Sequence, residues 1–146
     1  MKQSLSVFLL LGALLVIGYN RAMPNESRAE AQRIKNYLSG QRVLATYRDG
    51  GPIYGTYFFY DIHFCPSGQY MEFGQSRKQT ILDNVQVNNW KDYGTWDVVS
   101  FQGQVVLQIN LTSGGQKFFL IRLLPDGRIW VRDDISVVRQ GSAQCR

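Results

Sequence analysis

Alternation of apolar and polar residues is the feature that most limits how this chain can fold. In 104–111 the side chains of Val105, Leu107, Ile109 and Leu111 share one face, and mostly polar side chains share the other. A period of two residues indicates a β-strand with one buried face. Further strand-like segments follow along the chain, separated by short turns and by no helix. Strands joined by short turns pair as antiparallel neighbours, so we expect an all-β meander.

Eight strands are expected, with one further short piece. They are residues 42–48, 56–65, 69–73, 80–87, 94–101, 104–111, 117–124 and 128–132, and the short piece is 135–138. An antiparallel meander of eight strands can close into a barrel, which leaves no free edge, and a two-sheet sandwich is the alternative. The chain has 146 residues, which is enough for one such domain with one core.

A short amphipathic helix is expected before the first strand. The segment Ser27-Arg28-Ala29-Glu30 fits a capping box, and Gly40 can end the helix. Between them, the apolar side chains of Ala31, Ile34 and Leu38 share one helical face. We expect this helix to plug or buttress the β-core.

The amino terminus has the pattern of a secretory signal peptide. A lead that contains Lys2 precedes an uncharged and almost wholly apolar run at 5–17. This run has the length of a signal-peptide core and is shorter than the roughly 20 residues of a membrane-spanning helix. We expect cleavage and export to a secreted or periplasmic location, and the alternative is an uncleaved membrane anchor at 3–20. The expected division is a leader at 1–22, a linker and helix at 23–40, and the barrel domain at 41–146.

Charge argues against nucleic acid as a partner. Sixteen basic residues minus eleven acidic ones give a net charge of +5, and removal of Lys2 and Arg21 with the leader leaves 14 minus 11, or +3. The remaining charges are scattered, with Arg77-Lys78 as the only adjacent basic pair. A nucleic-acid footprint needs a dense basic patch, so we expect none here.

The two cysteines are expected to form a disulfide. Cys65 and Cys145 are the only pair, and an oxidising compartment favours joining them. The bond closes a loop of 145 minus 65, or 80, residues and ties the carboxy-terminal tail to the wall of the fold. Two unrelated thiols are the alternative. With one His and two Cys in the chain, we expect no multi-ligand zinc site, and no cofactor fingerprint is present.

The second expected strand shows which of its faces points inward. Phe58, Tyr60, Ile62 and Phe64 share one face, which we interpret as the interior, and this places Cys65 on the outer wall. Further interior candidates are Val43, Ala45, Tyr47, Trp96, Val98, Val105, Leu107, Ile109, Phe119, Ile121, Ile129 and Val131. A barrel of this size is either filled by side chains or keeps room for one small apolar ligand. Candidate ligand-lining residues are Phe58, Tyr60, Phe64, Trp96, Phe119 and Trp130.

The order of a leader, a short helix, an eight-strand meander and one disulfide to the tail resembles the lipocalins and the wider calycin barrels. Gly94-Thr95-Trp96 matches the Gly-x-Trp motif of lipocalins, which carry it on the first barrel strand, whereas here it falls near the fifth. The family packs a late-strand arginine over that tryptophan, and Arg122, Arg128 and Arg132 are the candidates here. The resemblance implies an extracellular or periplasmic binder of small apolar molecules, or an inhibitor of another protein.

Asp61 and His63 are the closest approach to a catalytic pair, since two residues on one strand share a face. No positioned nucleophile or oxyanion hole accompanies them, so we expect a solvent-facing histidine and no enzyme. Together with a reduced Cys65 they would offer metal-ligand types, which is an alternative to the disulfide.

Aromatic residues outside the expected core are candidates for contact with a partner protein. Trp90 and Tyr93 lie in an expected loop or strand edge beside two asparagines. Asn25 and Asn110 match the N-glycosylation acceptor pattern. The leading expectation is therefore a secreted binder of an apolar or amphiphilic small molecule. The alternative is a secreted interaction module, acting as an inhibitor, an effector or a subunit of an envelope complex, that uses its loops or outer wall.

Overall fold

A computed structural model describes residues 24–51, 54–79 and 84–145, and the expected leader at 1–22 lies outside them. The elements are α2 (Pro24–Leu38), β1 (Gln41–Asp49), β2 (Thr56–Phe64), β3 (Gln69–Gln79), β4 (Val85–Phe101), β5 (Gln104–Leu111), β6 (Gln116–Leu120), β7 (Arg122–Leu123), β8 (Ile129–Trp130) and β9 (Ile135–Ser142). The all-β class with one preceding helix is confirmed.

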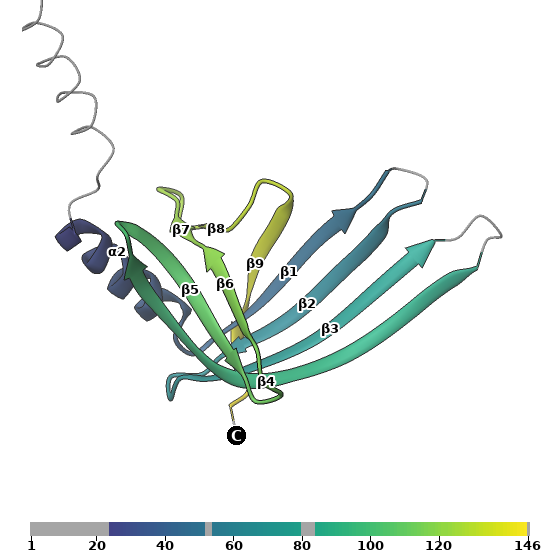
Figure 1. Ribbon diagram of the computed structural model, residues 1–146, viewed down its shortest axis with the longest axis horizontal. Coiled ribbons are helices and arrows are strands. Elements are labelled where there is room, and N and C mark those ends of the chain that lie inside the picture. The colour runs from purple at the N-terminus through teal and green to yellow at the C-terminus, as the bar shows by residue number, and fades with distance from the viewer. Residues whose placement is uncertain (1–23, 52–53, 80–83, 146) are drawn as a thin grey trace, which may run out of the picture.

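One strongly curved antiparallel sheet forms most of the molecule (Figure 1). Its seven strands lie in the order β6-β5-β4-β3-β2-β1-β9, so that every neighbour is consecutive in the chain except the pair of β1 and β9. The meander is therefore confirmed. The sheet is not closed: β6 and β9 are its two edges, and β7 and β8 form a separate two-stranded sheet, with β8 against β9.

Most of the expected strands are found, with two corrections. The strand expected at 104–111 has the bounds of β5, and the one expected at 42–48 is β1 with one residue added at each end. The expected separate strands at 80–87 and 94–101, with a loop between them, are wrong within the described residues, because β4 runs without interruption from Val85 to Phe101. The strand expected at 117–124 is divided at Ile121 into β6 and β7.

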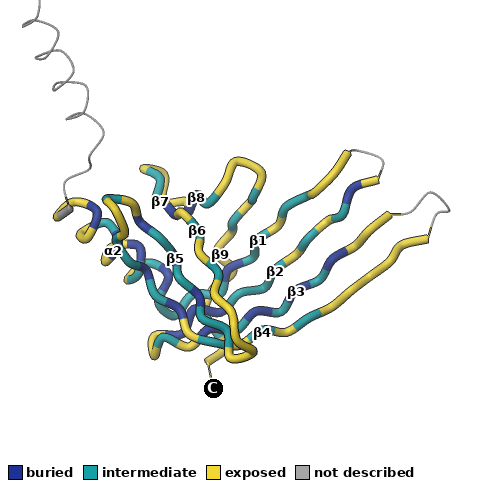
Figure 2. The backbone as a smooth tube through the Cα atoms, in the orientation of Figure 1, coloured by how far each residue is buried: buried dark blue, intermediate teal, exposed yellow. Residues whose placement is uncertain are grey.

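The helix α2 begins three residues earlier than expected and packs against β4 and β5. Ser27 is therefore inside the helix and not at its cap, and its hydroxyl group lies 2.5 Å from that of Ser100 on β4. Ile34 and Leu38 are almost fully buried on the face that the sequence predicted. Figure 2 shows that buried positions gather where the helix meets the sheet, whereas the far ends of β1 to β4 are largely exposed.

The disulfide between Cys65 and Cys145 is confirmed, with a Cα–Cα distance of 5.7 Å. It holds the tail across the outer face of β2, next to His63. The expectation that His63 faces solvent is wrong: its exposed fraction is 2%, because the tail covers the ring and the backbone N–H of Gln144 donates to Nδ1 at 2.9 Å. Since Cys65 is in the disulfide, its sulfur is not a thiolate ligand for a metal in this structure.

Candidate functional site

The concave face of the sheet encloses a cavity of about 250 Å³. Its walls come from β1, β2, β3, β5, β6, β8 and β9, with Leu38 of α2 at one end. Most of the lining side chains are aliphatic or aromatic, and the charged ones are Glu72, Lys117 and Arg132. The side chain of Arg132 is 60% exposed, so the part of the cavity that it lines reaches solvent. The curved sheet therefore surrounds an apolar chamber with a small number of polar points.

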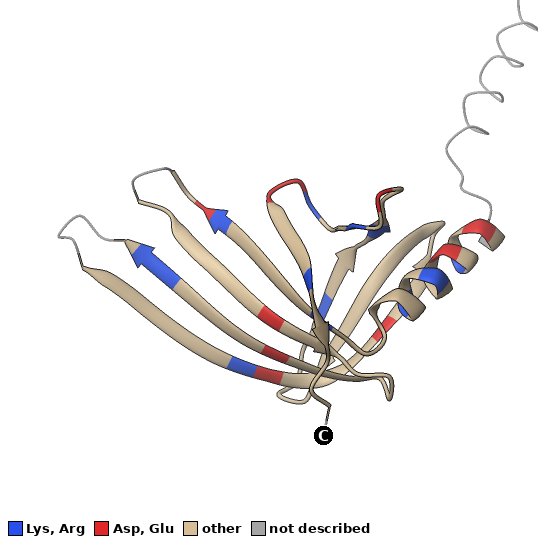
Figure 3. Cartoon of the chain, turned by 180° about the vertical axis from the view of Figure 1, so that it is seen from behind, with Lys and Arg blue, Asp and Glu red and all other residues tan. Residues whose placement is uncertain are grey.

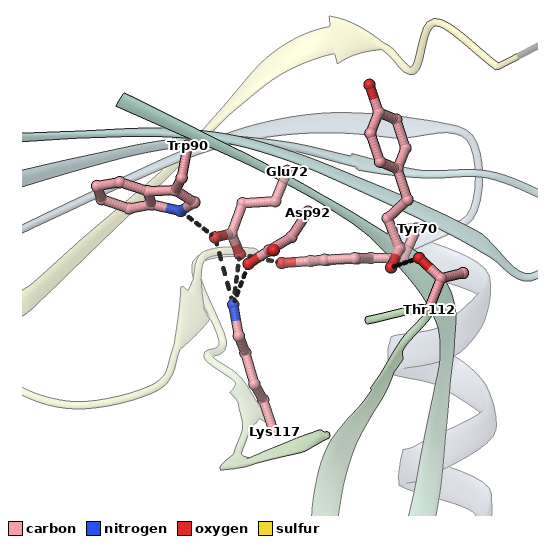
Figure 4. Close-up of polar contacts among 7 residues, drawn as sticks. Tyr70, Glu72, Trp90, Asp92, Thr112 and Lys117 are labelled. Carbon is pink, nitrogen blue, oxygen red and sulfur yellow. Dashed lines mark hydrogen bonds and ion pairs between the residues drawn. The ribbon is translucent and has the colours of Figure 1, made fainter. Parts of the chain in front are cut away.

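A polar cluster on β3, β4 and β6 lies at the cavity wall (Figure 4). Glu72 is at its centre, and its side chain is 4% exposed. Its carboxylate accepts hydrogen bonds from the Tyr70 hydroxyl and, at 2.8 Å, from the Trp90 indole N–H. Lys117 Nζ lies 3.3 Å from each oxygen of Glu72 and 3.2 Å from Asp92 Oδ2. The buried charge of Glu72 is thus compensated by hydrogen bonds from three different strand positions, as a buried carboxylate requires.

Burial keeps two tyrosines of the cavity protonated. It raises the pKa of Tyr70, and the adjacent carboxylate of Glu72 raises it further because a phenolate there would face a like charge. Burial also raises the pKa of Tyr60, with smaller contributions from Tyr47 and Glu72. Both phenols therefore stay protonated in more alkaline solution than an exposed tyrosine does.

Four aromatic rings continue the wall beyond the polar cluster, on β1, β2 and β4. The rings of Tyr47 and Phe58 are stacked with centroids 4.5 Å apart, and Tyr60 lies parallel to both. Tyr60 meets Trp90 at 68°, with centroids 5.5 Å apart. We call Tyr47, Phe58, Tyr60 and Trp90 the aromatic row. It joins the buried part of the chamber to the exposed ends of the strands.

The position of Trp90 depends on a glycine opposite it. Gly74 of β3 pairs with Trp90 of β4 in the strand register. A Cβ atom at position 74 would lie 1.9 Å from Cε2 of the indole, so only glycine leaves room for the ring to lie across β3. From there the indole N–H reaches Glu72, which lies two residues earlier on the same face of β3.

The structure distributes the six predicted ligand-lining residues over three environments. Tyr60, Phe64 and Phe119 line the cavity, and Phe58 belongs to the aromatic row. Trp96 is buried edge-on against Phe64, and its indole N–H donates to the carbonyl oxygen of Cys65 at 3.0 Å. Trp130 donates to Asp133 and lies beneath the guanidinium of Arg122. The guanidinium of Arg122 lies over the Trp130 ring, and that of Arg132 lies over the Tyr47 ring. In neither case is the ring that of Trp96, which the resemblance implied.

The two predicted partner-binding residues point to opposite faces of β4. Trp90 points to the inner face, where its indole N–H reaches Glu72 of the cavity wall, whereas Tyr93 is 46% exposed on the outer face. Both were expected in a loop or strand edge, and both lie inside β4, which has a neighbouring strand on each side. Sequence reasoning also missed Glu72 and Lys117. Alternation from Tyr70 places Glu72 on the inner face, but nothing in the third strand indicated its cationic partner Lys117 on β6.

The Asp61–His63 pair is engaged on the outer wall and not in the cavity. Arg42 donates to both oxygens of Asp61 at 2.8 and 2.7 Å, and this hydrogen bonding lowers the pKa of the carboxyl group. His63 Nε2 lies 3.4 Å from Asp61 Oδ1, and the edge of the Phe73 ring closes the other side. The arrangement holds the tail in place against β2.

Comparisons with protein-family models, with curated proteins and with solved structures find no match. Among the described residues, no helix has the length and apolar character needed to cross a bilayer. Within the same ranges no cluster of three or more His, Cys, Asp or Glu side chains is arranged to hold a metal ion.

Proposed function

We propose that this protein binds an apolar or amphiphilic small molecule in the concave face of its sheet. The observation that carries the proposal is the cavity of about 250 Å³ with its mainly apolar lining. An apolar cavity of about 150 Å³ is large enough to hold benzene, so the chamber has room for a somewhat larger molecule. A few convergent polar groups in an otherwise apolar chamber are typical of small-molecule sites, and Glu72 and Lys117 supply them here.

We propose an extracytoplasmic location for this binding. The charge-free apolar run at 5–17 after a basic residue supports export. The disulfide between Cys65 and Cys145 supports an oxidising compartment, because cytosolic thiols are kept reduced. A lipocalin-like relationship would be consistent with both, and with a ligand inside a curved meander, although the sheet here is open.

A pair of variants on β1 tests the binding site. Ala45 lines the cavity, opposite Tyr60 and Val137, so Ala45→Phe places a ring in the chamber. We expect the Kd of a neutral fluorescent probe such as N-phenyl-1-naphthylamine to rise about tenfold or more, a loss of roughly 1.4 kcal/mol of binding free energy. Thr46→Phe is the matched control, since Thr46 is exposed on the outer face of the same strand.

Native mass spectrometry of the full chain, isolated from its own host without detergent, is the second measurement. We expect a co-purifying small molecule that is absent from the Ala45→Phe variant. Equal probe binding by wild type and by Ala45→Phe would show that the chamber is not the binding site and would refute the proposal.

A second candidate is an interaction module, favoured by the outer side of the edge strand β6. Phe118 and Leu120 are 59% and 47% exposed there, on the side of β6 that pairs with no strand within residues 24–51, 54–79 and 84–145. An edge strand with large exposed apolar side chains is a site for pairing with another chain. The same mass measurement distinguishes the candidates, because this one expects a stoichiometric protein in place of a small molecule.

A further inference from the structure

The polar cluster contains two carboxylates on directly opposed strand positions. Glu72 of β3 and Asp92 of β4 are register partners, and Figure 3 shows acidic positions side by side on these neighbouring strands. Like charges opposite each other on one face of a sheet destabilise it, more so when one of them is almost fully buried. The fold therefore tolerates this pair only with cationic charge between the two side chains.

A single ammonium group serves both carboxylates. Lys117 reaches across from β6 and lies within 3.3 Å of each. Two carboxylates and one ammonium leave the cluster with a formal charge of 2 minus 1, or one negative charge in excess. A low-dielectric chamber strengthens the effect of such an excess on any charged molecule that enters it.

The other cation in the lining is also occupied. Arg132 Nε donates to Asp134 Oδ1 at 2.8 Å, and its guanidinium lies over the Tyr47 ring. An entering carboxylate would have to compete with Asp134 for Arg132, or with Glu72 and Asp92 for Lys117. An entering cation would share the carboxylate oxygens with Lys117 and would meet the one negative charge that Lys117 leaves in excess.

The aromatic row offers a cation a second source of attraction. The rings of Tyr60 and Trp90 meet at 68°, and the Trp90 indole N–H is bonded to Glu72. Aromatic faces attract ammonium groups, especially out of contact with water. Electron-rich rings and unbalanced carboxylate charge thus occupy the same side of the chamber.

From this arrangement we infer that the ligand is an apolar molecule with one cationic amine, held with the amine beside the Glu72–Asp92 pair and Tyr60 and the apolar part among the aliphatic lining. The inference rests on the proposed function, which it narrows to one class of amphiphile. It states that a cationic head is preferred to an uncharged one and that a carboxylate head is disfavoured.

Three probes with the same ten-carbon chain test the preference: decyltrimethylammonium, 1-decanol and decanoate. Each is added below its micelle concentration to the full chain at neutral pH, and displacement of N-phenyl-1-naphthylamine gives its Kd. We expect the ammonium probe to bind at least about fivefold more tightly than decanoate, with decanol between them.

A matched pair of aspartate variants assigns the preference to the cluster. Asp92→Asn removes the excess negative charge while Lys117 keeps Glu72 as its partner, so we expect the ratio of the decanoate Kd to the ammonium Kd to fall towards one. Asp97→Asn is the control. Asp97 is on the same strand and also pairs with a lysine, but that lysine is Lys35 of α2, at 2.7 Å, and not Lys117 at the cavity wall, so the ratio should be unchanged.

The outcomes separate the two proposals. Binding of all three probes with decanoate equal to or tighter than the ammonium probe would overturn this inference and leave the proposed function standing. Displacement by none of them, in a wild-type protein whose far-UV circular dichroism shows a β-sheet, would overturn the proposed function itself. A cation preference that is the same in wild type and in folded Asp92→Asn would overturn the assignment to this cluster.

Discussion

At the scale of single residues, small side chains at crossing points decide where the large ones lie. Gly74 lets the Trp90 indole lie across β3 and reach Glu72, and Gly94 lets the backbone of β5 approach β4 closely. The inward alternation of the β2 aromatic side chains was correctly predicted from their spacing. The ion pair of Glu72 with Lys117 was not, because Lys117 is 45 residues away in the chain, and spacing within β3 holds no information about that partner.

Gly94 is expected to be intolerant of a side chain. A Cβ atom there would lie 1.9 Å from the carbonyl oxygen of Asn110, which belongs to the backbone and cannot rotate away. We expect Gly94→Ala to lower the free energy of unfolding by about 2–3 kcal/mol through strain between β4 and β5. Urea denaturation followed by tryptophan fluorescence measures it.

Gly51→Ala is the control for this prediction, since nothing lies within 4 Å of an added Cβ atom at that position. Its unfolding free energy should stay within about 0.5 kcal/mol of the wild-type value. A Gly94→Ala variant of wild-type stability would mean that β4 and β5 leave room for a side chain at this position.

At the scale of elements, the strands with a clear period of two were predictable and the polar half of β4 was not. β5 alternates throughout and was predicted with its observed bounds. The run around Asn88 and Asn89 has the composition of a loop, yet it is extended because it pairs with β3 along its whole length. Both of its faces accept polar residues, because the residues from Val85 to Asn89 are all exposed to solvent.

The tail beyond β9 is held to β2 by the disulfide and by the hydrogen bond to His63. We expect Cys145→Ser to lower the free energy of unfolding by about 2–4 kcal/mol, because the loop of 80 residues is no longer closed in the unfolded chain. The same change should uncover His63, and NMR of its imidazole protons would then show access to solvent.

Gln144→Ala is the matched control, because it keeps both the disulfide and the backbone N–H that donates to His63. It should match the wild type in both measurements. An unchanged unfolding free energy for Cys145→Ser, with His63 still protected, would show that β9 alone holds the tail.

At the scale of the whole molecule, the sheet curves far enough to enclose a cavity without closing into a barrel. The sequence predicted the meander of consecutive strands and the inward faces of β1, β2 and β5. Closure could not be predicted, because it depends on the path of the chain after β6. The strand breaks at Ile121, and β7 and β8 then pair with each other instead of extending the main sheet. No periodicity in the sequence indicates that break.

Amide hydrogen exchange measured by mass spectrometry tests the open edge. β3 has a hydrogen-bonded neighbour on both sides, whereas β6 has one only on the side of β5. We expect amides of β6 to exchange about tenfold or more faster than those of β3, since the unpaired groups of an edge strand face water. Equal protection of the two strands would show that β6 is covered in solution, either by β9 or by another chain.

The pairing of β1 with β9 has a consequence for the rate at which the molecule forms. β1 to β6 can assemble hairpin by hairpin, each step joining segments that are already near one another in the chain, whereas Ala45 must find Val137 across nearly the whole described length. Contacts between residues that are far apart in the sequence slow the folding of β-rich proteins. If the disulfide between Cys65 and Cys145 forms early, it brings β9 close to β1 before the two strands pair. Oxidation would then raise the rate of that last pairing step as well as stabilise the folded protein.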